Sequence, residues 1–313
     1  MRVVTIYENT SLYRDKFVIQ GYQFGSGEKK ICVVGNTRGN EYQQLYVCSR
    51  LVEQLKQVES HALLTSGFEI LVIPSCNPYS LNIEKRFWPI DNTDINRMFP
   101  GYTEGETTQR IAAAIFEKIK DYEFGIQLAS FYMPGDFMPH VLIMKTELDY
   151  VDLATQFGMP YVVVRPPRPY DTTTLNYNWQ VWKTRAFSLY TTTTDHLDNE
   201  SALRGVSAIL RFMSAQKLLY LRQHNGFISD ILDESRDMAF IRTPFAGFFI
   251  PKTKVEQEVQ KGELLAEIHS PMDGSMLDRI TAPCNGIVFF MHSKPLIYSH
   301  TAAVKLIKLH GES

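Results

Sequence analysis

The stretch ICVVGNTRGNEYQQLYVCSRLV, residues 31–52, decides the fold of this chain. Its first part is a run of β-branched residues that stops at Gly35, which is typical of a buried strand. From Glu41 to about Val58 the apolar residues recur with helical spacing, so the second part predicts an amphipathic helix. We expect its buried stripe to contain Leu45, Cys48, Leu51, Val52 and Leu55. A short turn, Arg38-Gly39-Asn40-Glu41, joins the two elements and places two charged side chains at the end of a strand.

The same alternation of strand and helix continues to about residue 220. Further strands are predicted at 68–74, 124–130, 140–145, 160–164 and 186–191. Helices are predicted from Thr103 to about Lys120, over 148–158 with Gly158 as its end, and from Glu200 to about Tyr220. This pattern predicts an α/β fold with a mainly parallel (mixed) sheet and helices on both faces. Ligands of such sheets bind beyond the carboxyl ends of the strands, here the turns after Gly35, Pro74, Ser130 and Thr191.

The residue pattern of the sequence changes after about residue 228. Helical periodicity ends, and short strands separated by Gly and Pro follow. TPFAGFFI (243–250) returns as APCNGIVF (282–289), with a proline and a glycine at matching places. We therefore predict two domains, residues 1–228 and residues 229–313, the second a small, pseudo-symmetric, all-β barrel.

Composition excludes several classes of partner. The chain has 313 residues, 44% of them hydrophobic, and a net charge of −2. Such a balance gives no reason to expect a nucleic-acid or membrane partner, and no apolar run is long enough to span a bilayer. The start of the chain has no secretion-type apolar segment, and the four cysteines lack metal-site or disulfide spacing, so we expect a cytoplasmic protein with reduced thiols. Cys76 follows a strand, but no base for a nucleophile is evident, and a buried structural thiol is the alternative.

Three polar residues stand out near the predicted strand ends, namely Arg86, Asn96 and Arg97. Forked guanidinium donors beside an amide are what recognition of a carboxylate requires. Each arginine taken alone is more simply a surface or capping charge. The proline-rich stretch 165–177 could cover the same edge, with Arg165 and Arg168 as further anion contacts or as parts of a solvated loop.

These segments carry a family resemblance. The block RFWPIDNTDINRMFPG (86–101), with Asn77-Pro78 before it, resembles a signature of the succinylglutamate desuccinylase/aspartoacylase family of zinc-carboxypeptidase-like amidohydrolases. The C-terminal segments resemble that family's appended barrel, which is similar to a biotinyl/lipoyl hammerhead. No carrier lysine lies at the turn SPMDGSM (270–276). The resemblance, from about residue 28 to the end, implies a zinc-exopeptidase-like fold and hydrolysis of N-acyl amino acids.

The resemblance also implies roles for single residues. Arg86 would polarise the scissile carbonyl, and Asn96 with Arg97 would bind the substrate carboxylate. The family holds zinc by the His and Glu of a His-Gly-x-Glu turn and by a second His at an Asp-Leu-His strand end. Here only Glu41 survives from that set, because Arg38 stands at the first histidine.

Two more positions depart from the family pattern. The strand end reads Gln127-Leu128-Ala129, so Ala129 stands at the second histidine and Gln127 at the acid beside it. Tyr190 falls at the position of the family's catalytic Glu. With a reference pKa near 10, a tyrosine is a poor general base at neutral pH.

These substitutions predict that the usual zinc site is lost. A catalytic zinc needs about three protein ligands. Two like unit charges about 4 Å apart repel by about 4 kcal/mol at an effective dielectric of 20, and a divalent ion roughly doubles this. We expect Arg38 to fill the metal position and pair with Glu41, with no zinc cofactor. With Arg86 and Arg97 it would form a cationic pocket for a small carboxylated, N-acyl amino acid-like molecule.

Two alternatives stay open at this point. The chain could be an active metal-dependent deacylase whose ligands are relocated to Glu41, His140 and His196. It could also be a non-catalytic scaffold for an active homologue, and a homo-oligomer is compatible with either reading.

Overall fold

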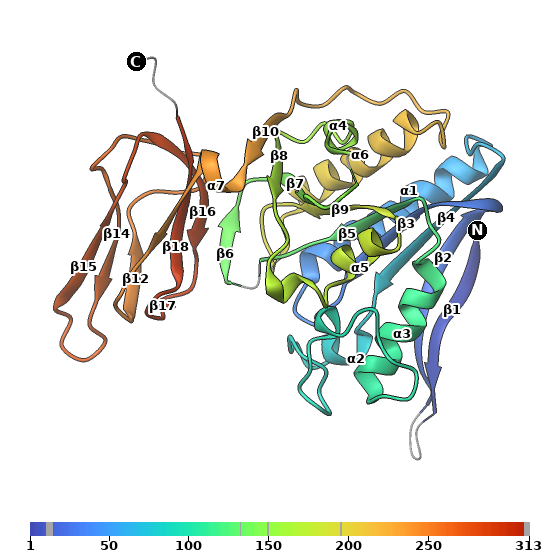
Figure 1. Cartoon of the computed structure of the whole chain (residues 1–313), viewed down its shortest axis with the longest axis horizontal. Coiled ribbons are helices and arrows are strands. Elements are labelled where there is room, and N and C mark those ends of the chain that lie inside the picture. The colour runs from blue at the N-terminus through green and yellow to red at the C-terminus, as the bar shows by residue number, and fades with distance from the viewer. Residues whose placement is uncertain (11–14, 132, 149, 195, 310–313) are drawn as a thin grey trace.

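The computed structural model describes residues 1–10, 15–131, 133–148, 150–194 and 196–309. A large α/β unit is followed by a smaller β unit that lies beside it (Figure 1). The large sheet has the spatial order β1 (Arg2–Asn9), β2 (Phe17–Gly25), β4 (Gly67–Ser75), β3 (Gly27–Asn36), β5 (Phe124–Leu128), β9 (Arg185–Tyr190), β7 (His140–Met144), β8 (Tyr161–Arg165) and β10 (Asp230–Asp233).

Most neighbours in this sheet are parallel. Strands β4, β3, β5 and β9 form one parallel run, and β7, β8 and β10 form another. The pairs β1–β2, β2–β4 and β7–β9 are antiparallel. The predicted mainly parallel, mixed sheet is thus confirmed, and its central strands are the continuous apolar runs that burial on both faces requires.

Helices cover both faces of the large sheet and create two separate cores. They are α1 (Tyr42–Ser60), α2 (Pro78–Leu81), α3 (Thr107–Ile119), α4 (Val151–Thr155), α5 (Leu175–Val181) and α6 (Asn199–Ala215), with 3₁₀ turns η1 (Ile95–Arg97) and η2 (Pro169–Asp171). One core packs α1 and α6 against the sheet around Leu51 and Phe212. The other packs α3 and α5 around Ile111 and Trp179. The predicted stripe of α1 is buried except for Leu45, which is half-buried.

The helix predicted over 148–158 is shorter in the structure, where α4 covers Val151–Thr155, and three further details differ from the prediction. Helix α3 begins at Thr107 and not at Thr103, because residues 102–105 form a turn and the Glu106 N–H donates to Gln109 Oε1 at 3.0 Å. Helix α6 ends at Ala215, since Lys217 has a positive φ of 61° that breaks the helix before Tyr220. The strands β1 and β2 were not predicted, because polar and half-exposed residues interrupt their apolar pattern.

The C-terminal unit consists of two antiparallel sheets that face each other. One contains β11 (Met238–Arg242), β18 (Ala302–Lys308), β16 (Gly286–His292) and β13 (Glu258–Val259), with β6 (Gly135–Phe137) added on β16. The other contains β15 (Met276–Thr281), β14 (Leu264–His269), β12 (Gly247–Pro251) and β17 (Leu296–Ile297). Residues such as Leu265, Ile268 and Leu306 fill the space between them.

The internal repeat of the sequence corresponds to β12 and β16, one strand in each sheet. Both strands begin with the repeated glycine. A Cβ at Gly247 would lie 2.4 Å from the carbonyl oxygen of His269, and one at Gly286 would lie 2.5 Å from that of Ile307. The repeat therefore keeps a glycine where each strand closely approaches its neighbour.

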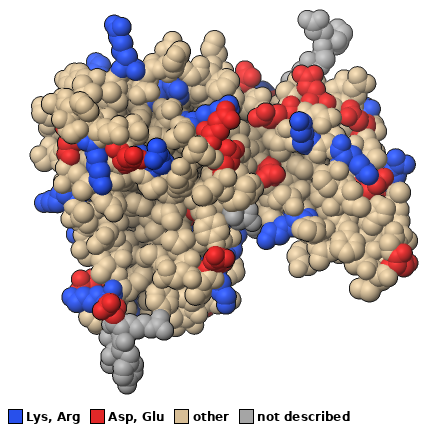
Figure 2. Space-filling model, turned by 180° about the vertical axis from the view of Figure 1, so that it is seen from behind, with Lys and Arg blue, Asp and Glu red and all other residues tan. Residues whose placement is uncertain are grey.

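The two units are joined by more than the chain connection. β10 lies beyond the predicted boundary at residue 228 yet pairs with β8 of the large sheet, and β6 of the first unit pairs with β16 of the second. The helix α7 (Glu234–Asp237) follows β10 directly. In the described part of the chain no helix is both long and apolar enough to cross a membrane. On the face in Figure 2, basic and acidic side chains are interspersed.

Candidate functional site

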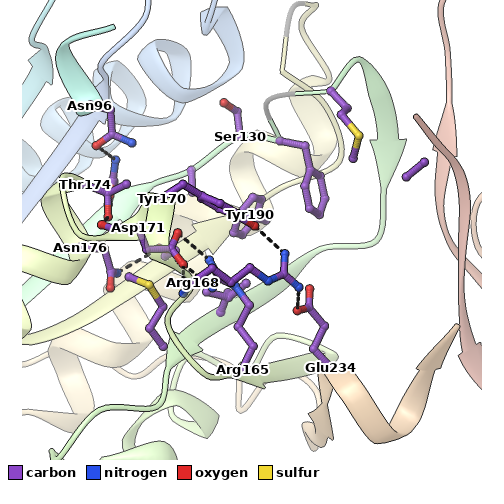
Figure 3. A pocket seen from close by; sticks show the side chains of 18 of the residues that line it. Asn96, Ser130, Arg165, Arg168, Tyr170, Asp171, Thr174, Asn176, Tyr190 and Glu234 are labelled. Carbon is purple, nitrogen blue, oxygen red and sulfur yellow. Dashed lines mark hydrogen bonds and ion pairs between the residues drawn. The ribbon is translucent and has the colours of Figure 1, made fainter. Parts of the chain in front are cut away.

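A cavity of about 380 Å³ lies at the carboxyl edge of the large sheet, where the C-terminal unit meets it. The turns after β3, β5 and β8 and the strands β7 and β9 form its walls on one side, and β11, β18 and Glu234 of α7 on the other. Figure 3 shows the labelled side chains converging on this space from several elements. Of the four turns that the sequence predicted as the place of a site, those after Gly35 and Ser130 line the cavity, whereas those directly after Pro74 and Thr191 do not.

The turn after β3 is held in a tight position by its glycine. A Cβ at Gly39 would lie 2.4 Å from the carbonyl oxygen of Lys85 and 2.4 Å from the carbonyl carbon of Ser80. Only glycine allows the turn to pack this closely on the segment after α2. The contact helps to fix the positions of Arg38 and Glu41, which line the cavity.

The carboxylate of Glu41 is fully engaged by donors of the protein. Its Oε2 accepts from the backbone N–H groups of Thr37 and Arg38, at 2.8 and 3.0 Å, and from the Thr37 hydroxyl at 3.3 Å. Its Oε1 accepts from Arg38 Nη1 at 3.0 Å and from the Ser130 hydroxyl. Glu41 is 1% exposed. A metal ion or another hydrogen-bond donor could bind this carboxylate only after displacing Arg38 or Ser130.

Arg38 lies between two carboxylates. Besides Glu41, its Nε donates to Oδ2 of Asp94 at 2.9 Å, and the arginine itself is 5% exposed. Although burial alone would lower the pKa of the Arg38 guanidinium, Glu41 and Asp94 raise it above its ordinary value. The predicted Arg38–Glu41 pair is confirmed. Asp94 was missed as its second partner, although it belongs to the same conspicuous DINR segment as Asn96 and Arg97.

Asn96 and Gln127 form a neutral amide pair on the wall of the cavity. Gln127 Nε2 donates to Asn96 Oδ1 at 3.1 Å, and the Leu175 N–H donates to the same oxygen at 3.2 Å. The backbone donor fixes the orientation of the amide, which leaves the nitrogen of Asn96 as the end that can donate to a ligand. An aspartate at position 127 would place a second acceptor against this oxygen, so the glutamine is matched to Asn96.

The other two predicted arginines occupy different environments. Arg97 lines the cavity, donates to the carbonyl oxygen of Tyr170 and lies 5.5 Å from the centre of the Tyr170 ring. Arg86 is not among the residues that line the cavity. It forms an ion pair with Asp94 at 3.5 Å and lies over the ring of Phe87, and burial together with the charge of Arg38 lowers its pKa.

The stretch 165–177 does reach the cavity, but its arginines are paired. Arg165 holds Asp171 through two hydrogen bonds, at 2.6 and 3.0 Å. Arg168 forms an ion pair with Glu234 and donates to the Tyr170 hydroxyl at 2.7 Å (Figure 3). Both arginines are thus largely neutralised before any ligand arrives.

Tyr190 and His140 stack on each other beside the cavity, with ring centres 4.4 Å apart. Burial raises the pKa of Tyr190 to about 12. Burial lowers the pKa of His140 to about 3, and its Nδ1 lies 2.8 Å from the carbonyl oxygen of Met138. Neither side chain is tuned as a general base near neutral pH. Ala129 lies at the end of β5, lines the cavity and offers no polar side chain.

The residues of the relocated-metal alternative do not come together. His196 is exposed and its ring contacts the Thr193 hydroxyl, whereas His140 is buried. Among the residues that the structure describes, no three His, Cys, Asp or Glu side chains form a group that could hold a metal ion. Cys76 is fully buried, and burial raises its pKa well above the ordinary thiol value, as expected for a structural cysteine.

Comparison with known proteins shows the family to which this chain belongs. The model of the succinylglutamate desuccinylase/aspartoacylase catalytic domain matches residues 27–214, more than half of the chain. The chain belongs to this family. The resemblance read from the sequence is therefore confirmed. A comparison with curated proteins gives no match.

Solved structures of the family share the fold over nearly the whole chain. A succinylglutamate desuccinylase from a Silicibacter species is 17% identical, with a TM-score of 0.81 over 96% of this chain and 92% of that one. An aspartoacylase family protein from Mesorhizobium loti is 19% identical, with a TM-score of 0.80 over 99% and 96%. The ectoine utilization protein EutE (DoeB) from Ruegeria pomeroyi, in a product-bound structure, is 16% identical, with a TM-score of 0.79 over 97% and 98%. These solved structures share the fold over nearly the whole length of this chain, which includes the C-terminal sheets.

Proposed function

We propose that this member of the family binds a small carboxylate-bearing molecule in its cavity and does not perform zinc-dependent amide hydrolysis. The observation that carries the proposal is the position of the Arg38 guanidinium, which lies between Glu41 and Asp94 at the bottom of the cavity. In the family pattern the first zinc ligand stands at this position. Here a permanent cation takes the place of a ligand.

The residues around Arg38 do not fit a zinc ion. The one remaining carboxylate, Glu41, accepts five hydrogen bonds within the protein. The second histidine position is Ala129, and Gln127 is occupied with Asn96. A catalytic zinc requires about three protein ligands and an open position, and the approach of a dication to Arg38 is strongly unfavourable.

The charges of the cavity favour an anionic ligand. Its lining includes six basic side chains, Arg38, Arg97, Arg165, Arg168, Arg242 and Lys305, against three acidic ones, Glu41, Asp171 and Glu234. Within the described residues, no carboxylate forms an ion pair with Arg97, Arg242 or Lys305. Arg97 together with the amide of Asn96 supplies the forked donors and the orienting group that carboxylate recognition needs.

Equilibrium binding tests this proposal directly. Thermal unfolding would be followed with N-acetylglycine and dicarboxylates at millimolar concentration, and with N-acetylglycinamide as the matched ligand that lacks the carboxylate. The acids should raise the midpoint, since a ligand at about ten times its Kd stabilises by about 1.4 kcal/mol. The amide should have little effect. Carboxylate binding would be contradicted if the amide stabilised the protein as much as the acids do. It would also be contradicted if none of these ligands stabilised the protein.

A pair of variants locates the site. Arg97→Gln should abolish the ligand-induced shift. Arg279→Gln, on an exposed position of β15 away from the cavity, should leave it unchanged. Deacylation of N-acyl amino acids in the presence of added zinc is expected to be undetectable, and a turnover that disappears with Glu41→Gln would overturn the proposal.

A further inference from the structure

Lys305 is a buried lysine that the proposed function uses only as one of the positive charges of the cavity. It lies on β18, is 6% exposed and lines the cavity from the C-terminal unit. In the strand register it stands between Phe240 of β11 and Phe290 of β16. Its Nζ lies 4.4 Å from the centre of the Phe131 ring, 4.8 Å from that of Phe240 and 5.8 Å from that of Phe290.

The amine contacts ring faces and not acceptors. Within the described residues, no hydrogen-bond acceptor or carboxylate is bound to Lys305 Nζ. Glu234, the carboxylate that acts electrostatically on Lys305, forms an ion pair with Arg168. Ring faces stabilise the ammonium form partly, but they accept no conventional hydrogen bond and cannot replace its water shell. Because the Lys305 amine lines the cavity without such an acceptor, a ligand in the cavity would be in a position to contact it.

The surroundings also favour the neutral amine. Burial lowers the pKa of Lys305 to about 8, against an opposing effect of Glu234, and the nearby arginines 165, 168 and 242 act in the same direction as burial. A desolvated lysine next to other cations is the arrangement that makes an amine nucleophilic near neutral pH. Phe131, Met133, Leu142 and Met144 form an apolar part of the wall of the same cavity.

We propose that Lys305 forms an imine with an α-keto acid bound in the cavity. This rests on the proposed function, because the carboxylate of the keto acid would be held by the cationic side of the cavity. The neutral amine adds to the keto carbon and forms a C–N bond, while a proton passes from nitrogen to the former carbonyl oxygen. The nitrogen then gives up its second proton, and the oxygen leaves with it as water while the C=N bond forms. No electrons are gained or lost, and hydrolysis reverses the step.

The cavity suits such a ligand in size and polarity. Its volume of about 380 Å³ is in the range of small-molecule sites, roughly 300–1,000 Å³. Arginines and the Asn96 amide suit the carboxylate end, and the phenylalanine rings around Lys305, with the methionines of the cavity wall, suit an apolar side chain. We therefore expect phenylpyruvate to react more readily than pyruvate.

Borohydride trapping followed by peptide mapping tests the proposal on the native chain. The protein would be treated with phenylpyruvate or pyruvate and reduced, and each lysine peptide would be examined by mass spectrometry. The expected result is a reduced adduct on Lys305 and little on an exposed lysine such as Lys261. Adducts spread over exposed lysines, with the Lys305 peptide unmodified, would overturn the proposal. This readout does not depend on a variant that folds.

Variants and carbonyl-free ligands separate this proposal from the broader one. Lys305→Arg removes the primary amine and should lose the adduct, whereas phenyllactate, which has a carboxylate but no carbonyl, should stabilise the native chain. Stabilisation by phenyllactate without any adduct from phenylpyruvate would overturn the imine and leave carboxylate binding intact. Equal labelling of Lys305 by phenylacetaldehyde, with no stabilisation by phenyllactate, would overturn the carboxylate part of both proposals.

Discussion

The strongest consequence of the site geometry is the effect of removing the Arg38 cation. In Arg38→Met the side chain keeps a similar apolar length, but Glu41 and Asp94 lose their shared partner. Two charge-assisted hydrogen bonds, at 3.0 and 2.9 Å, are broken. Hydrogen bonds to charged groups contribute about 1.5–3 kcal/mol each. Breaking a buried ion pair from one side costs about 3–5 kcal/mol.

The two estimates agree on a loss of about 4 kcal/mol in the free energy of unfolding of Arg38→Met. Urea unfolding followed by circular dichroism would measure it. The control Arg279→Met, at an exposed position, should change the free energy by no more than about 0.5 kcal/mol. In Arg38→Met/Glu41→Gln the second substitution removes one unpaired carboxylate, so the double variant should be less destabilised than the sum of the two single variants.

A small effect would refute the reasoning. If Arg38→Met loses less than about 1 kcal/mol, Arg38 does not hold the two carboxylates in place in solution. Strict additivity in the double variant would likewise mean that Arg38 and Glu41 do not interact. Either result would remove the physical basis for placing a cation at the position of the metal.

Three further predictions follow from the same geometry. Folding lowers the pKa of His140 from 6.5 to about 3, so its contribution to the free energy of unfolding is present above about pH 6.5 and is lost as the pH falls toward 3. His140→Phe should flatten this part of the profile of unfolding free energy against pH. An unchanged profile would contradict the burial of a neutral ring. Gly39→Ala should destabilise the fold by about 2 kcal/mol or more, because the new Cβ would lie 2.4 Å from backbone atoms of the neighbouring segment. Thermal unfolding measures this loss. A variant as stable as the wild type would show that the turn packs differently. Iodoacetamide should modify Cys284 in the native protein but not Cys76, whose raised pKa and burial make it inert; native labelling of Cys76 would revive its reading as a nucleophile.

The sequence predicted the α/β class because buried parallel strands and amphipathic helices have distinct apolar periods. The strand and helix in residues 31–52 are found as predicted, and two of the four predicted turns, those after Gly35 and Ser130, line the cavity. The strands β1 and β2 escaped prediction because half-exposed antiparallel strands carry mixed polarity, with Ile6, Ile19 and Phe24 as their few buried apolar side chains. Helix ends were misplaced by a few residues where a turn or a positive φ ended the periodic pattern.

The site was predicted in part, for a similar reason. The Arg38–Glu41 pair lies within one turn, so short-range reasoning was sufficient to find it. The partners Asp94 and Ser130 come from segments far away in the chain, and only the folded sheet brings them to Arg38. The sequence could not predict that Lys305 lines the cavity, because a lysine in a strand of the C-terminal unit has no sequence feature that indicates such a contact. The predicted roles of Arg86 and Tyr190 remain predictions.

The most direct test of the account is the zinc content of the purified chain. The protein would be equilibrated with a slight excess of zinc, freed of unbound metal, and analysed by inductively coupled plasma mass spectrometry. We predict a zinc content far below one ion per chain, unchanged in Glu41→Gln. A stoichiometric zinc ion that is lost in Glu41→Gln would contradict the claim that the Arg38 cation occupies the place of the metal.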